Sequence, residues 1–213
     1  MTQQVLDVLL DPESFYERDD AASSVAILAL VVVALAAIGG AAGWLSWQAT
    51  STMFARMDGG AGMAEAVGSV TVAFSLLGPV LAWVVYAGAF HAMGRLLQGD
   101  GSLRTTFVYA GWGFLPRLLA AVVNLAATWY VLGVVSVPAE VTSASMQAYT
   151  QQIQSHPATL ASTVVGVAIL LWSAYIWTHA VEAAHDIERE DAAIAVGVPV
   201  ALALILRLSN FVL

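Results

Sequence analysis

Residues 96–117 read LLQGDGSLRTTFVYAGWGFLPR, and they interrupt a chain that is otherwise apolar enough to enter lipid. The GDGS sequence at 99–102 is typical of a turn, and its serine is suited to cap a following helix. A single helix over 103–137 would be about 50 Å long, which exceeds the roughly 30 Å hydrocarbon core of a bilayer. Pro116 divides this stretch, because proline disfavours helix in the residue before it.

We therefore predict a short interfacial helix over 103–114, lying along the membrane surface, and a transmembrane span that begins at Pro116. The side chains expected to share the apolar face of the short helix are Leu103, Phe107, Ala110 and Phe114. In this interpretation the proline marks the point at which the chain turns back into lipid.

The composition predicts the fold class. Of the 213 residues, 60% are hydrophobic and 10% are charged, and the mean hydropathy is +0.80. Soluble domains carry roughly 25% charged residues. No side chain in residues 21–55 is charged near neutral pH, and in residues 66–94 only His91 can be. Apolar stretches of more than about 18 residues match the thickness of a bilayer. We predict an all-α integral membrane protein.

The apolar stretches predict a single membrane domain of five transmembrane helices over residues 23–213. A cytoplasmic amphipathic leader over residues 1–22 precedes it. The spans are expected at about 24–47, 67–97, 116–137, 158–180 and 192–213.

The connections complete this arrangement. Ser23 and Ser24 are expected to cap the first span. Residues 48–65 and 138–157 are polar and are expected to form loops. The fourth span is expected to continue beyond the membrane as a helix through HAVEAAHDIERE, residues 179–190.

Arginine placement predicts the orientation, because short loops rich in basic residues stay on the cytoplasmic side. With the amino terminus inside, five arginines fall at cytoplasmic ends and two fall outside. The inner set is Arg18, Arg95, Arg104, Arg117 and Arg189, and the outer set is Arg56 and Arg207. We expect a multi-pass protein of the cell membrane, with its amino terminus in the cytoplasm and its carboxyl terminus outside.

The composition also excludes several classes of function. The chain has no cysteine, and therefore no disulfide, thiolate metal site or catalytic cysteine. Fifteen acids, seven arginines and no lysine give a net charge of −8, which repels nucleic acid and is typical of high-salt organisms. The first twenty residues hold six acids, the reverse of a cleavable signal. No nucleophile motif or phosphate loop is present, so we expect neither an enzyme nor a cofactor.

The strongest cluster of chemistry-bearing residues lies at the end of the fourth span. His179, Glu182, His185 and Asp186 follow helical spacing, and His91 at the end of the second span is expected at the same level. Glu-x-x-His is a spacing used by carboxylate-bridged metal proteins. Two interpretations stand: these residues form ion pairs with nearby arginines, or they bind a divalent metal ion or a proton.

For the ion-pair interpretation, we predict that Arg95 or Arg117 contacts Glu182 or Asp186. Arg117 has two further interpretations, since it begins the third span. It binds a lipid phosphate, or it only extends its guanidinium to the interface.

Small residues on the first span point to close helix packing. Gly39 and Gly43 form a Gly-x-x-x-Gly pattern. This face packs inside the five-helix domain or forms a homodimer, and the sequence leaves both uses open.

The order of motifs resembles the Yip family of Ypt/Rab-interacting membrane proteins, in a prokaryotic-type member. The motifs are LLDPESFYE in the leader, the GDGS turn with Pro116, and WSAYIWTHAVEAAHDIEREDAAIAV at the exit of the fourth span. The matching residues are Gly99, Gly101, Ser102, Gly111, Pro116, His185, Ala192 and Ala193. Trp112 stands where the family has tyrosine, and acids fill the turn after His185. The resemblance implies five spans and contacts with lipids and protein partners.

Two functions follow as hypotheses. The leading one is a non-enzymatic membrane scaffold or interaction protein of the Yip type, which acts through membrane lipids and protein partners. The alternative is a small transporter or channel that uses the cluster at His179 for a divalent metal ion or a proton.

Overall fold

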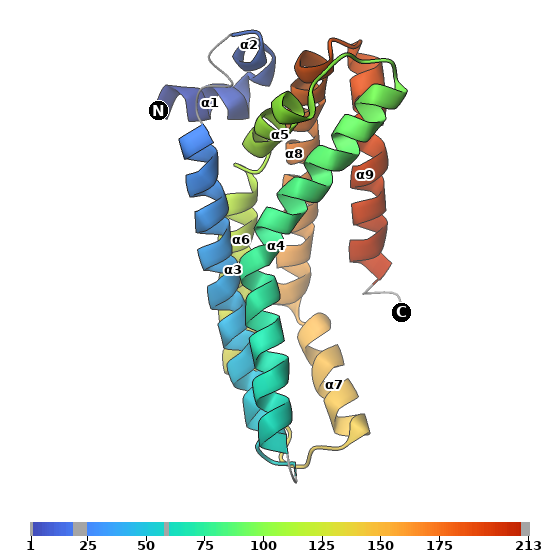
Figure 1. Ribbon diagram of the computed structural model, residues 1–213. Helices are drawn as coiled ribbons and strands as arrows, with labels where there is room; N and C mark the ends of the chain where they lie inside the picture. The colour runs from blue at the N-terminus through green and yellow to red at the C-terminus, as the bar shows by residue number, and fades with distance from the viewer. Residues whose placement is uncertain (1, 19–24, 58–59, 210–213) are drawn as a thin grey trace. The chain divides into compact units, whose positions relative to one another are not determined.

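The computed structural model describes residues 2–18, 25–57 and 60–209, and every regular element in them is an α-helix (Figure 1). The helices are α1 (Thr2–Leu10), α2 (Pro12–Tyr16), α3 (Val25–Phe54), α4 (Gly60–Leu96), α5 (Leu103–Trp112), α6 (Arg117–Val134), α7 (Ser143–Gln154), α8 (Pro157–His185) and α9 (Arg189–Ser209). The predicted fold class, all-α, is confirmed.

Five of these helices are long and apolar enough to cross a membrane. They are α3, α4, α6, α8 and α9, in the order expected for the five spans. Their most apolar stretches are at most 28% buried within the protein, and large apolar side chains such as Phe74 and Ile205 are about two-thirds exposed. Lipid is the solvent that covers such surfaces, which agrees with a five-span membrane protein.

Helices α3, α4 and α8 are longer than the spans predicted from the sequence, whereas α6, which ends at Val134, is shorter than the predicted 116–137. The expected loop over residues 48–65 is wrong over most of its length, because α3 continues to Phe54 and α4 begins at Gly60. The hydroxyl groups in the extension are satisfied within the helix: Thr50 Oγ1 donates to the Ser46 carbonyl at 2.9 Å, and Thr52 Oγ1 donates to that of Gln48 at 2.9 Å. Polar side chains that bond their own helix do not have to end it.

The expected loop over residues 138–157 contains a helix that the sequence interpretation missed. Thr142 caps α7 by accepting from the Ser145 amide at 3.1 Å, and Ser145 Oγ accepts from the Thr142 amide at 2.9 Å. This reciprocal pair is a capping box, which nucleates a helix even in a polar segment. Two predictions lie outside the described residues: the caps at Ser23 and Ser24, and the end of the last span at Leu213.

The chain separates into two compact units, each of which is described by itself. Unit 1 takes the described residues within Met1–Val33, Val80–Leu118 and Val167–Leu213. Unit 2 takes those within Ala34–Pro79 and Leu119–Gly166.

In unit 1, α5 packs inside the unit and not only along a surface. Trp83 Nε1 donates to the Phe107 carbonyl at 2.8 Å, and Trp177 Nε1 donates to the Ala110 carbonyl at 2.7 Å. Of the residues predicted to share the apolar face, Ala110 and Phe114 are buried within the unit, whereas Leu103 is 54% exposed; Thr106, outside that set, is buried too. The helix has partners on several sides, and a single membrane-facing stripe does not describe it.

The predicted break at Pro116 is confirmed within one residue. Helix α5 ends at Trp112, four residues form tight turns, and α6 begins at Arg117. Pro116 itself is buried directly before the first turn of α6, where a missing amide donor carries little cost.

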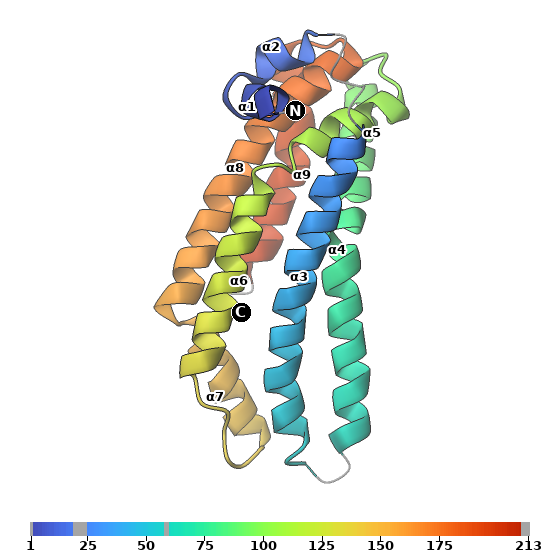
Figure 2. The same ribbon diagram turned by 90° about the vertical axis from the view of Figure 1, so that its left-hand side faces the viewer.

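In unit 2, the Gly39 and Gly43 face of α3 packs against α4. A methyl group added at Gly39 would come within 2.8 Å of the Ser75 carbonyl oxygen, and one at Gly43 would meet the Ser75 side chain. The glycine face is therefore used inside this unit. A separate apolar cluster joins α3, α6 and α7, with α7 beside the end of α6 (Figure 2); its buried members are Met53, Val131, Val135 and Tyr149.

Candidate functional site at the end of α8

The end of α8 carries the residues singled out from the sequence, and it presents them on two different sides. Helix α8 runs to His185, and Asp186 follows with a positive φ of 53°, so the chain leaves the helix there. At 3.6 residues per turn, His179 and His185 point about 120° apart around the helix, with Glu182 between them. The two sides have different chemistry.

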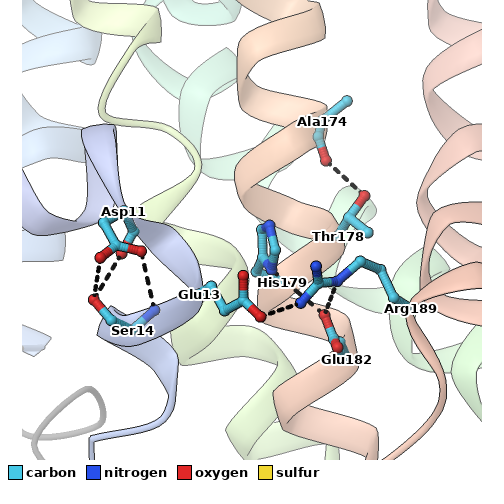
Figure 3. A network of polar contacts seen from close by, with 8 residues as sticks. All are labelled: Asp11, Glu13, Ser14, Ala174, Thr178, His179, Glu182 and Arg189. Atoms are coloured by element: carbon cyan, nitrogen blue, oxygen red, sulfur yellow. Dashed lines mark hydrogen bonds and ion pairs between the residues drawn. The ribbon is translucent and has the colours of Figure 1, made fainter.

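On the first side, Glu182 belongs to a polar network that joins α2, α8 and α9 of unit 1 (Figure 3). Arg189 at the start of α9 donates from Nε to Glu182 Oε2 at 3.1 Å and from a terminal nitrogen to Glu13 Oε1 of α2 at 2.6 Å. His179 Nδ1 lies 3.4 Å from the same Glu182 oxygen. The network joins the leader to α8 and α9.

Helix α2, which supplies Glu13, is short and depends on its cap. Asp11 accepts from the Ser14 amide at 3.3 Å and from the Ser14 hydroxyl at 2.7 Å (Figure 3). These hydrogen bonds to Ser14 hold the pKa of Asp11 below its ordinary value of 3.8, because they stabilise the charged carboxylate. Pro12 occupies the first helical position, where its fixed φ suits a helix.

Aromatic and polar contacts fasten the leader to the rest of unit 1. Phe15 is 3% exposed, and its ring centroid lies 5.0 Å from that of Trp112. Tyr16 donates its hydroxyl to the Tyr109 carbonyl at 3.1 Å, and burial raises the pKa of Tyr16 well above its ordinary value, which keeps that donor protonated. Trp172 Nε1 donates to the Leu9 carbonyl at 3.3 Å. The leader is a packed part of unit 1.

Between the leader and the end of α8 lies a pocket of about 230 Å³. Its lining includes four acids, one histidine and one arginine: Glu13, Glu17, Glu182, Asp186, His179 and Arg189. Arg189 is engaged with Glu13 and Glu182, which leaves Glu17 and Asp186 as carboxylates with no ion-pair partner among the described residues. The pocket favours a positively charged group.

On the second side of α8, His185 is 1% exposed and has polar partners that carry no full charge. Its Nε2 lies 2.9 Å from Thr106 Oγ1 of α5, and His91 Nδ1 lies 3.4 Å from the same hydroxyl. Thr106 donates its proton to the Ser102 carbonyl at 2.9 Å, so its oxygen is left to accept from the imidazoles. This arrangement favours the tautomer with the His185 proton on Nε2.

Three glycines close around the His185 ring. A methyl group added at Gly94 would lie 2.7 Å from the ring, and one at Gly101 would lie 2.8 Å from it. At Gly99 it would lie 2.7 Å from the His185 Cβ, and the Asp100 amide donates to the His185 carbonyl at 3.0 Å. His185 Nδ1 has no hydrogen-bond partner within the described part of the chain, so a second proton there would find no acceptor. Gly94, the turn over residues 99–102 and His185 pack closely together. We call this group of residues the histidine cradle.

The predicted contact of Arg95 or Arg117 with Glu182 or Asp186 is wrong, because Arg189 takes that place. Arg95 donates to the Gly99 carbonyl at 3.0 Å and lies 3.7 Å from Asp100, so it braces the glycine turn.

Arg117 lies in an aromatic setting. Its guanidinium carbon is 5.1 Å from the Phe114 ring centroid and 5.7 Å from that of Tyr86, within the range of cation–π attraction. One terminal nitrogen of Arg117 is buried without a hydrogen-bond partner in the described residues.

The five predicted metal ligands are not brought to one point. His179 and Glu182 belong to the ion-pair network, His185 and His91 meet at Thr106, and Asp186 lines the pocket. Within residues 2–18, 25–57 and 60–209, no three histidine, aspartate or glutamate side chains gather as metal ligands require. Helical spacing placed these residues near one another in sequence, but their side chains diverge.

The sequence did not point to two residues that take part in these contacts. Glu13 is 176 positions from Arg189 in the chain, and only the LLDPESFYE motif indicated that this segment matters. Thr106 connects the two imidazoles, and no local pattern marks it, because it is an ordinary hydroxyl on a short helix.

Comparison with known proteins now gives these features a family. A model of the Yip1 domain matches residues 6–209, which is nearly the whole chain. The chain belongs to the Yip1 domain family. In this Yip1-domain protein the glycine turn and His185, separate motifs in the sequence, are the two halves of the histidine cradle.

An uncharacterized protein of Methanocaldococcus jannaschii is 30% identical to this Yip1-domain protein over 56 residues. The matched stretch covers 26% of this chain and 40% of that protein, less than half the length of either. No solved structure matches this chain.

Proposed function

We propose that this protein is a non-enzymatic Yip-type scaffold of the cell membrane, which acts through lipid contacts and through a protein partner held at its leader. The observation that carries the proposal is the docking of the leader onto α8 and α9 by Glu13, Arg189 and Glu182. It forms a shaped acidic pocket from three separate elements.

The pocket favours a partner with an arginine or lysine side chain. Glu17 and Asp186 line it without an ion-pair partner among the described residues, so a cation placed there would gain two carboxylates. Exposed ion pairs are individually weak, which suits a reversible contact.

Cross-linking in native membranes tests the scaffold proposal. We expect a partner to be recovered with the unchanged protein, and its recovery to fall when Glu17→Gln and Asp186→Asn are combined. The matched control, Glu188→Gln with Glu190→Gln, removes two acids outside the lining and should leave recovery unchanged. Equal recovery from both double variants would rule out the pocket as the contact.

We also propose that the amino terminus is cytoplasmic, since five of the seven arginines are then inside. Cysteines introduced at Ser102 and Ser145 of this cysteine-free chain should react with an impermeant reagent from opposite sides of intact membranes. Reaction of Ser102→Cys from the outside would reverse the orientation, and reaction of both from one side would contradict five spans.

A further inference from the structure

Unit 2 contains a cavity of about 420 Å³, which is independent of the leader and its pocket. It is lined by the carboxyl-terminal parts of α3 and α6, by the amino-terminal part of α8 and by α7. The cavity therefore lies at one end of three candidate spans, where a bilayer has its boundary with water. Its volume falls within the roughly 300–1,000 Å³ of small-molecule sites.

The deep part of the cavity is apolar. Met53 is 7% exposed and Val131 is 1% exposed, and both line it. Met146 and Ile153 of α7 pack against the same cluster. Methionine adapts to irregular apolar shapes, so this part suits a flexible hydrocarbon chain.

One buried polar group in the lining lacks a partner. Tyr149 is 8% exposed, and its hydroxyl has no hydrogen-bond partner in the described residues. Burial raises the pKa of Tyr149, so the phenol remains a donor. A buried donor without an acceptor is costly, and an oxygen atom of a ligand would satisfy it.

The neighbouring hydroxyl groups are already used. Thr50, Thr150 and Ser162 donate to carbonyls of their own helices at 2.9, 3.0 and 2.9 Å. Tyr149 differs from them, because its hydroxyl is buried and has no partner among the described residues.

The rim is polar and uncharged. Asn124, Thr150 and Gln154 line the cavity with exposed side chains, and no residue of the lining is ionised at neutral pH. A headgroup with a full charge would lose hydration here without a counter-charge. The lining therefore favours a neutral amphiphile over an anionic or cationic one.

We infer that this cavity binds one hydrocarbon chain of an uncharged membrane amphiphile. Its neutral polar end carries an oxygen acceptor for the Tyr149 hydroxyl and lies among the polar residues of the rim. The chain packs on Met53 and Val131. This site has no lining residue in common with the pocket proposed for the scaffold contact, so each of the two proposals can hold if the other fails.

Photolabelling in nanodiscs tests this inference. The probe is a monoacylglycerol with a diazirine in its chain, compared with fatty-acid and alkyl-trimethylammonium probes of the same chain length. We expect saturable labelling by the neutral probe at Met53, Val131, Met146 or Ile153, and displacement by unlabelled monoacylglycerol. Equal labelling by all three probes, or labelling spread over the lipid-facing helices, would overturn the inference.

Tyr149→Phe removes the donor and keeps the ring. We expect the apparent affinity for the neutral probe to fall about two- to tenfold, as for loss of one hydrogen bond. Tyr130→Phe is the matched control, because Tyr130 lies in the same unit, is 52% exposed and does not line the cavity. Equal affinities of the two variants would overturn the role of Tyr149.

Filling the cavity gives a second measurement. Ala127 lines it, and Ala127→Leu should reduce labelling at the cavity. The melting temperatures of both variants report folding, and Tyr149→Phe should keep or raise that of the unchanged protein, because it removes a buried unpaired hydroxyl. Undiminished labelling of a folded Ala127→Leu protein would contradict binding in this cavity.

Discussion

His179 and His185 are six residues apart on α8, and both are less than 5% exposed, yet their surroundings differ. His179 and Arg189 both contact Glu182 Oε2, and all three residues line the acidic pocket beside the leader. His185 is enclosed by glycine backbone and the Thr106 hydroxyl. Burial alone therefore does not define a site. His179 contacts a partly exposed ion pair, whereas His185 is part of the packing.

The largest expected effect is at His185. Replacing it by alanine removes a fully enclosed ring and the partner of Thr106, so we expect a loss of about 2–4 kcal/mol, as for other large-to-small changes in packed interiors. His156→Ala is the control, since His156 is half-buried and accepts only the Ala158 amide at 3.2 Å. It should lose about 1 kcal/mol. Thermal unfolding in nanodiscs measures both, and equal losses would mean that the histidine cradle is not packed as described.

Substitution of Gly101, which faces the His185 ring, tests the same packing from the glycine turn. A methyl group at Gly101 would meet the Ala184 carbonyl and the His185 ring, so Gly101→Ala should cost about 1–3 kcal/mol through overpacking. Gly197 in α9 has no atom within 4 Å of an added methyl group, and Gly197→Ala should be neutral or gain up to about 1 kcal/mol. If both substitutions had the same effect on the melting temperature, the glycine turn would not be in contact with His185.

A smaller effect is expected on the His179 side. The loss for Glu182→Ala combined with Arg189→Ala should be smaller than the sum of the two single losses, because either single change already removes the Glu182–Arg189 contact. Arg189 keeps Glu13 as a partner in the Glu182→Ala variant. With side-chain exposures of 29% and 49%, the pair should show a coupling of about 0.5–1 kcal/mol that weakens in high salt. Glu190→Ala with Arg189→Ala is the control cycle. A coupling energy of zero between Glu182 and Arg189 would show that this ion pair does not contribute to stability.

The smallest expected effect is that of metal ions. Because His179 and His185 do not converge on one point, a chelator or added zinc or manganese should leave the melting temperature unchanged. A large metal-dependent increase that disappears in His185→Ala would instead show that the two sides come together around an ion.

Much of the fold could be predicted from local patterns. Apolar stretches of bilayer length mark five spans, and Pro116 marks the break before the third, because hydrophobic thickness and proline geometry act locally. The ends of helices are predicted less well. Thr50 and Thr52 satisfy their hydroxyls inside α3 although the sequence there is polar, and the capping box at Thr142 starts a helix in polar sequence.

The amino-acid sequence by itself determined that this protein is all-helical, has five spans of bilayer length and carries a cluster of ionisable residues at the end of the fourth span. Only the tertiary structure decided which of those groups meet. Glu182 pairs with Arg189 and through it with Glu13, and His185 meets Thr106 and the glycine turn. The physical reason is that helical period and hydrophobicity are properties of neighbouring residues. Ion pairs and buried hydrogen bonds depend on which distant segments pack together.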